Sequence, residues 1–155
     1  MDLHIVDARP LMPSGLGALQ SSASEEGVKN VSTLVQDWSI GKTLFDGKGE
    51  CLLIAQADGL NVGVGGTLKC KAVPEALRVS RFYVLPEWRK RGIAGAIANE
   101  VLIHAHKFAD VITCNAQASE LAAPFWESLG FAKVNISGLT HIYLPTDQRI
   151  GRVPR

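Results

Sequence analysis

The fold is decided by one stretch of the chain, Val84-Leu85-Pro86-Glu87-Trp88-Arg89-Lys90-Arg91-Gly92-Ile93-Ala94-Gly95. An apolar segment ends at its start, a proline turns the chain, and a basic loop leads into a helical pattern. The first N–H groups of a helix lack partners within the helix and carry the positive end of its dipole. Gly92, Ala94 and Gly95 keep large side chains away from that backbone. The stretch therefore predicts a site for a phosphate group, and we expect a pyrophosphate.

Patterns typical of other phosphate sites do not fit this sequence. Residues 63–68, Gly-Val-Gly-Gly-Thr-Leu, lack the third glycine of the dinucleotide fingerprint and lie within an expected hairpin rather than before a helix. The sequence also contains no G-x-x-x-x-G-K-[ST] loop. Nucleotide hydrolysis and nicotinamide chemistry are therefore disfavoured.

The residue periodicity around the loop predicts an alternation of strands and helices. Strands are expected at residues 3–8, 51–55, 60–70, 77–85, 111–114, 131–135 and 140–144, and helices within 13–24, 28–45, 94–107 and 119–129. Asp58-Gly59 predicts a tight hairpin, and Gly63, Gly65 and Gly66 predict a bulge or a close backbone approach. This order indicates an α+β domain in α/β/α layers, with a mixed, largely antiparallel sheet of about seven strands and about four helices.

The length and composition suit one folded domain. The chain has 155 residues, of which 46% are hydrophobic and 20% charged, and these values argue against intrinsic disorder. We expect the domain to span residues 1–145 and a C-terminal tail to occupy residues 146–155. The formal net charge is only +1, so no global positive field is available for nucleic acid or an anionic membrane. Any anion site must therefore be local, and nucleic acid is not an expected partner.

The cysteine and N-terminal patterns predict a cytoplasmic location. Cys51, Cys70 and Cys114 cannot all pair and form no C-x-x-C motif, which is typical of reduced thiols in an intracellular protein. The N-terminal residues show no secretory signal, and no apolar run approaches the roughly 18 residues that span a bilayer, so no membrane partner is expected. His104 and His106 would lie on different faces of one helix, so a shared metal is not expected.

Two motifs in the expected order carry a family resemblance. The first is Arg or Gln, two residues, Gly, one residue, then Gly or Ala, which Arg89, Gly92 and Ala94 match. The second is aromatic-aromatic-Glu-x-Leu-Gly-Phe, which residues 125–131 match as Phe-Trp-Glu-Ser-Leu-Gly-Phe. In both motifs, and in the order of elements over residues 3–144, the chain resembles the GNAT superfamily of acyl-CoA-dependent N-acetyltransferases. The resemblance implies the acyl-CoA N-acyltransferase fold of that family.

The resemblance also implies a cosubstrate, acetyl-CoA, and the residues that bind it. Backbone amides over residues 89–95 would hold its pyrophosphate, and the strand edge at 82–84 would pair with its pantetheine arm. The amide of Val84 would donate to the thioester oxyanion. Ser119 stands where the family often has an Asn that contacts the cofactor, although a helix N-cap would also explain a serine there. The implied cofactor-binding residues are Phe82, Tyr83, Val84, Arg89, Lys90, Arg91, Gly92, Ile93, Ala94, Gly95, Ser119 and Trp126.

The chain departs from the family at the positions that move protons. A base Glu is often found on the strand before the loop or on the following strand, where this sequence has Arg78 and Cys114. The Tyr that often protonates the departing thiolate is replaced by Trp126, whose indole N–H donates a hydrogen bond but no proton. A lone strand cysteine is more often a core residue than a nucleophile.

The sequence therefore does not identify the general base. An amine with a pKa near 10 must lose a proton before it attacks. The catalytic candidates are Tyr143, Tyr83 and Glu75, with water relays as a further option.

The sequence as a whole predicts an N-acetyltransferase that joins acetyl-CoA and a primary amine in a ternary complex without a metal. The acceptor is either a small-molecule amine or a protein N-terminus, and the resemblance allows a homodimer. The alternative is an acyl-CoA-binding sensor or regulatory module without turnover, which the missing base and acid would support.

Overall fold

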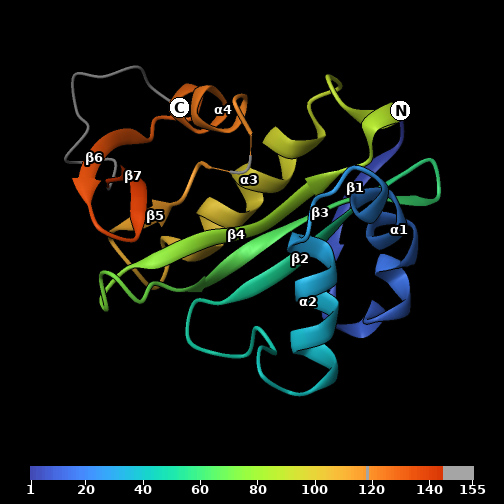
Figure 1. The fold of residues 1–155 in the computed structure, drawn as a ribbon, viewed down its shortest axis with the longest axis horizontal. Coiled ribbons are helices and arrows are strands. Elements are labelled where there is room, and N and C mark those ends of the chain that lie inside the picture. The colour runs from blue at the N-terminus through green and yellow to red at the C-terminus, as the bar shows by residue number, and fades with distance from the viewer. Residues whose placement is uncertain (118, 145–155) are drawn as a thin grey trace.

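The computed structural model describes residues 1–117 and 119–144, which form a seven-stranded mixed sheet with helices on both faces (Figure 1). The strands are β1 (Leu3–Asp7), β2 (Cys51–Ala57), β3 (Leu60–Lys69), β4 (Leu77–Val84), β5 (Ile112–Cys114), β6 (Ala132–Ile136) and β7 (Leu139–Tyr143). The helices are α1 (Gly17–Glu25), α2 (Asn30–Ser39), α3 (Ile93–Ala105) and α4 (Ala122–Ser128), with 3-10 turns η1 (Arg9–Leu11), η2 (Ser14–Leu16) and η3 (Pro86–Trp88). The predicted fold class is confirmed, and the predicted strand boundaries agree to about two residues. The expected tail at 146–155 lies outside the described residues.

The strands lie in the order β1-β2-β3-β4-β5-β7-β6, and the only parallel pair in the described part of the sheet is β4 with β5. That pair is short, because its register contains only Leu77 opposite Ile112 and Arg78 opposite Thr113. Beyond Arg78 the two strands diverge. The second half of β4 therefore bonds to β3 on one edge and leaves its other edge facing a gap.

The helices cover the two faces of the sheet unequally. Helices α1 and α2 lie on one face, and α3 crosses the other (Figure 1). Glycines in β3 allow the close packing on the α3 face: a Cβ on Gly63 would lie 3.1 Å from Ile97 Cδ1, and a Cβ on Gly65 would lie 2.7 Å from the Phe82 ring. The predicted close backbone approach at these glycines is thus confirmed. The predicted bulge of this strand lies at Val62, the extra residue against β2, whereas the register shift between Val64 and Gly66 reflects an extra residue in β4.

Two predicted helices are shorter than expected. Helix α2 ends at Ser39, because Gly41 takes a left-handed conformation with φ of 72° and breaks the helix. Phe45 therefore lies in the following loop, with φ of 54°, and its fully buried side chain joins the core from there. Helix α4 begins at Ala122 rather than at Ser119, which places Pro124 in the first turn, where its missing N–H costs no helical hydrogen bond.

Other expected features of the chain agree with the structure. Asp58 and Gly59 both have positive φ, 50° and 84°, as the predicted hairpin turn requires. Gly130 follows α4 with φ of 104° and ends the helix. No helix within the described residues is long and apolar enough to cross a membrane.

Substitution of Phe45 tests the packing of the loop after α2. We expect Phe45→Ala to lower the free energy of unfolding by about 3–5 kcal/mol, because it removes a fully buried ring. The neighbouring Leu44 is 37% exposed, so Leu44→Ala should cost far less and serves as the control. Chemical denaturation measures both, and equal losses for the two variants would contradict the assigned core position of Phe45.

Candidate functional site

The N-terminus of α3 is open and carries no side-chain cap. Gly92 precedes the helix with φ of 82°, and no side chain hydrogen-bonds to the first turn. A Cβ on Gly92 or Gly95 would meet no heavy atom within 4 Å, so no side chain of the described residues fills the space beside these two positions. The first backbone N–H groups of α3 thus face open space with the positive end of the helix dipole behind them. The geometry suits an anion such as a phosphate.

Lys90 and Arg91 extend this site on its exposed side. Lys90 takes a left-handed conformation, with φ of 63°, which turns the chain toward the helix. The guanidinium of Arg91 lies 4.7 Å from the centroid of the Trp88 ring, and both basic side chains are exposed. Their charges raise the local positive potential in a chain whose net charge is close to zero.

Arg89, the first residue of the predicted motif, turns its side chain toward the protein. Its Nε donates to the carbonyl oxygen of Val84 at 2.9 Å. Its two terminal nitrogens donate to the carboxylate of Glu26, at 3.0 Å from Nη1 to Oε2 and 2.6 Å from Nη2 to Oε1. The guanidinium therefore joins the end of β4 to the end of α1. The backbone N–H of Arg89 donates to Pro86 O at 3.2 Å, so Arg89 fixes the loop rather than offering its amide to a ligand.

Glu26 was not among the predicted site residues, yet it organises this side of the site. The Tyr83 hydroxyl donates to Glu26 Oε1 and lies 2.9 Å from Ser22 Oγ. Hydrogen bonds from Arg89, and then from Tyr83, lower the pKa of Glu26 below its ordinary value. Burial, and then the bond to Glu26, raise the pKa of Tyr83. The sequence offers no signal for this network, because its members lie about sixty positions apart.

A bulge in β4 shapes the open strand edge. Arg81 has φ of 65°, and Asn30 Nδ2 donates to the carbonyl oxygen of the next residue, Phe82, at 2.9 Å. Leu85 N donates to Val62 O on the β3 side. Since backbone groups alternate along an antiparallel strand, the N–H of Val84 points away from β3 and into the gap.

Aromatic residues close the α4 side of the gap. The Phe82 ring packs edge-on against Trp126, with centroids 4.9 Å apart and planes at 87°. Trp126 also contacts Phe125 and Phe131, and it is 7% exposed. The gap is therefore walled by a rigid apolar cluster on this side. Ser119 lies before α4 and its Oγ accepts from Leu121 N at 3.3 Å, so it does not cap the helix as its alternative role required.

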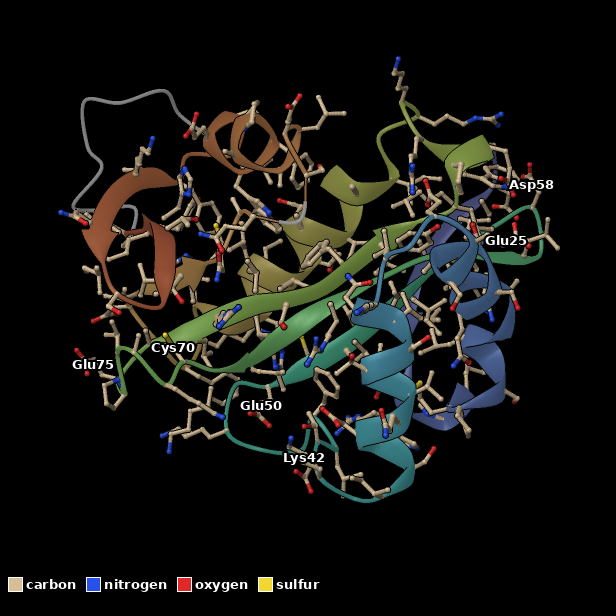
Figure 2. The ribbon with its side chains drawn as sticks, viewed as in Figure 1. Glu25, Lys42, Glu50, Asp58, Cys70 and Glu75 are labelled. Carbon is tan, nitrogen blue, oxygen red and sulfur yellow. The ribbon has the colours of Figure 1, made fainter. Side chains whose placement is uncertain are left out.

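The three proton-transfer candidates are not brought together. Glu75 lies beside Cys70 at one end of the sheet (Figure 2) and borders residues 106–111, which follow the C-terminal end of α3. Tyr143 is fully buried and packs against Phe131 at 5.1 Å between ring centroids. Only Tyr83 lies near the loop, and its hydroxyl is held by Glu26.

Cys114 lies beside a histidine that the sequence did not place near it. Its strand partner is His141, whose Nε2 donates to Glu127 Oε2 at 2.7 Å and whose Nδ1 lies 2.7 Å from Thr140 Oγ1. Both ring nitrogens thus bond to groups other than the thiol. Burial raises the pKa of Cys114 to about 12, so the thiol is protonated at neutral pH and is a poor nucleophile. This favours the core interpretation of Cys114.

Among residues 1–117 and 119–144, no three His, Cys, Asp or Glu side chains group closely enough to hold an ion.

Comparisons with known proteins bear on the family and the fold of the chain. Residues 19–140 match the family model described as an acetyltransferase (GNAT) domain. A solved structure from Exiguobacterium sp. 255-15, described as a candidate acetyltransferase, is 26% identical, with a TM-score of 0.82 over 93% of this chain and 94% of that one. No curated protein sequence matches the chain.

More distant structures share the fold. The PaiA N-acetyltransferase from Thermoplasma acidophilum, solved with coenzyme A, has a TM-score of 0.63 at 15% identity over 93% of this chain and 99% of that one. A chimeric spermidine N-acetyltransferase based on the Vibrio cholerae protein has a TM-score of 0.66 at 14% identity over 95% of this chain and 98% of that one.

The Glu26 network predicts a pH-dependent contribution to stability. Because folding lowers the pKa of Glu26, its contribution is present above the ordinary value of 4.5 and is lost as pH falls through the lower, folded-state pKa. Glu26→Gln should therefore destabilise the protein near neutral pH by about 1 kcal/mol or less, since the pair is partly exposed, and this difference should shrink below about pH 4.5. Thermal melts across pH measure it.

The neighbouring Glu25 provides the control for this measurement. Glu25→Gln removes the same charge without touching Arg89. A pH-independent effect of Glu26→Gln, or the same profile in both variants, would contradict the network.

Proposed function

Because this chain belongs to the GNAT acetyltransferase family, we propose that it is an N-acetyltransferase that moves an acetyl group from acetyl-CoA to a primary amine. Membership makes the chain an acyltransferase. The observation that carries the finer proposal is the gap beside β4, which begins beyond Arg78 and opens toward the uncapped N-terminus of α3. A single extended ligand with a phosphate at one end fits such a path.

The phosphate end of acetyl-CoA would bind at the loop. Backbone N–H groups over residues 90–95 hold the pyrophosphate, including those of Gly92, Ile93 and Ala94, whereas the N–H of Arg89 donates to Pro86 O. Lys90 and Arg91 contribute long-range attraction from the exposed side. The Arg89 side chain acts on this site indirectly, because it fixes the loop against Val84 and Glu26.

The reactive end would lie along the open edge of β4. The pantetheine arm lies along the edge at Phe82, Tyr83 and Val84, where the outward-facing Val84 N–H is available to it. The Phe82 and Val84 carbonyl oxygens already accept from Asn30 and Arg89, so the arm forms fewer backbone bonds than a further strand would. Acetyl-CoA supplies a thioester whose carbonyl carbon an amine can attack. The Val84 N–H, which points into the gap, stabilises negative charge that develops on the thioester oxygen. Trp126 and Phe82 exclude water from one side, and Ser119 is a polar contact at the mouth.

Deprotonation of the amine would rely on solvent. Glu75 and Tyr143 lie away from the Val84 edge, and the Tyr83 hydroxyl donates to Glu26. The amine therefore loses its proton through water, and the rate should rise as pH approaches the pKa of the acceptor, about 10 for an alkylamine. The acceptor is a small-molecule amine or a protein N-terminus, and residues 1–145 form the catalytic domain.

A sensor function is the second candidate. The protonated, buried Cys114 thiol and the remote Glu75 favour a domain that binds acyl-CoA without turnover. Binding alone does not distinguish the two functions, so the cosubstrate site and turnover need separate tests.

The cosubstrate site is tested by adding a negative charge where the pyrophosphate would lie. Wild-type protein with acetyl-CoA at about a hundred times its Kd should gain about 2.7 kcal/mol, a midpoint shift of several degrees. Gly95→Asp places a carboxylate in the first turn of α3, which favours the helix but repels phosphate. We expect this variant to keep its own melting temperature and to lose the acetyl-CoA shift.

Asn99→Asp is the matched control for that experiment. It adds the same charge at an exposed position one turn further along α3. Its shift should equal that of the wild type. A shift that survives in Gly95→Asp would overturn the assigned phosphate site.

Turnover is tested by thiol release from acetyl-CoA with a panel of primary amines. The proposal predicts release that depends on the amine and rises with pH toward the amine pKa, because no protein base sets a lower optimum. Acetyl-CoA binding with no release across the panel would support the sensor instead. A flat pH profile with release would contradict the solvent route.

A further inference from the structure

Two arginines of β4 lie on the face of the sheet that α2 covers. Leu77 lies on the α3 face, because a Cβ on Gly49 would lie 2.5 Å from Leu77 Cδ1 and 3.0 Å from Cβ of Phe108, which follows α3. The next residue, Arg78, therefore points to the opposite face. Arg81 also lies on that face, because its Nη2 is 4.0 Å from Oδ2 of Asp37 in α2. The two guanidinium groups therefore share one side of β4, at the point where its partner β5 diverges.

The backbone of Arg81 is strained. It takes the left-handed conformation, with φ of 65°, inside the β4 bulge, where a non-glycine residue is strained by about 1–2 kcal/mol. Without the extra residue of the bulge, the strand alternation would send this side chain to the α3 face. Strain of this kind often marks a functional position.

The charges on this face are unbalanced. Asp37 is 14% exposed and Arg81 26% exposed at their side chains. Burial, with a smaller contribution from the positive charge of Arg78, lowers the pKa of Arg81, while Asp37 opposes that effect. Within residues 1–117 and 119–144, Arg78 forms no ion pair. Two cations thus face one carboxylate, which leaves a net charge of one positive unit in a half-buried place.

This face keeps some exposed surface beside the diverging end of β4, since the Arg81 side chain is 26% exposed there, and an acceptor would approach the thioester from it. On the other face, Phe82 packs against Trp126, and Val84 packs with Ile93 near Gly63. Protein therefore fills the space behind the open edge. Arg81 and Val84 are three residues apart, or roughly 10 Å along a strand, a span that one small molecule can bridge between a guanidinium and the gap.

We propose that the acceptor is an amine that also carries a carboxylate, which Arg81 and Arg78 bind while the amine enters the gap. The class is that of amino acids and longer aminocarboxylates. Guanidinium groups match carboxylate geometry well, and one carboxylate balances the net charge, whereas a phosphate dianion exceeds it. Polyamines are disfavoured because they add positive charge. This inference rests on the proposed N-acetyltransferase function.

The test compares acceptors that differ only in the carboxylate. Thiol release is measured for β-alanine and 4-aminobutyrate against alkylamines of the same length, with O-phosphoethanolamine and spermidine alongside. We expect the aminocarboxylates to have the highest kcat/KM. Equal kcat/KM for the alkylamines, or a preference for spermidine or phosphoethanolamine, would overturn the proposal while leaving acetyl transfer intact.

Substitutions in β4 test which residues cause the preference for aminocarboxylates. Arg81→Gln should lower the ratio of kcat/KM for aminocarboxylates to kcat/KM for alkylamines by about tenfold or more. Arg78→Gln is the second variant, with a smaller loss expected. Arg9→Gln, at an exposed site paired with Asp7, is the control and should change nothing. An unchanged preference in both β4 variants would also overturn the proposal.

A binding measurement separates this inference from the proposed function. In the presence of CoA, N-acetyl-β-alanine should bind wild-type protein and bind Arg81→Gln at least about tenfold more weakly. The uncharged N-propylacetamide should not distinguish the two proteins. If no amine is turned over but this difference is found, the carboxylate site stands and the transferase function fails. Equal binding to both proteins would refute the carboxylate site whatever the turnover.

Discussion

The site depends on one constraint, that β4 has a full partner on one edge only. A strand inside a sheet normally satisfies its backbone groups on both sides, and an exposed edge attracts another chain. Here β5 pairs with β4 at two positions and then diverges. The Phe82 and Val84 carbonyl oxygens beyond that point accept from Asn30 and Arg89, so the outward-facing N–H of Val84 is the group left for a ligand. The bulge at Arg81 and the glycines of β3 maintain this opening, because they let β4 bend while α3 and the Phe82 ring stay close to the sheet.

The opening is stabilised by contacts that join distant parts of the chain. Glu26 binds Arg89 and Tyr83, and so links the end of α1 to the end of β4 and to the loop before α3. On the other side, Glu127 of α4 binds His141 of β7. These polar contacts flank the gap and set the positions of its walls. Residues of both recognisable motifs thus contribute to the scaffold as well as to the surface that a ligand would meet.

Charge in this protein is organised locally. The net charge of +1 conceals a basic loop at the N-terminus of α3 and a second, half-buried basic pair on β4. The two lie at different places along the same strand-to-helix path, one suited to phosphate and one to carboxylate. An acyl transfer that joins a phosphate-bearing donor to an acidic amine would use both, and the absence of a large global field would leave its selectivity to these short-range contacts.

The sequence by itself determined the features that depend on neighbouring residues. The strand–proline–helix loop at 84–95, the Asp58-Gly59 turn and the order of elements all follow from local backbone preferences and periodicity. The ends of helices were harder to predict from the sequence. Gly41 ends α2 earlier than its periodicity indicates, and the core residue Phe45 lies in the loop that follows.

Tertiary structure alone decided the side chains of the site. It turned Arg89 toward Glu26, set His141 beside Cys114 and brought Arg81 to Asp37, across separations along the chain that carry no periodic signal. The physical reason is that periodicity reports which face of an element is buried, whereas the partner on that face is chosen by the packing of the whole sheet.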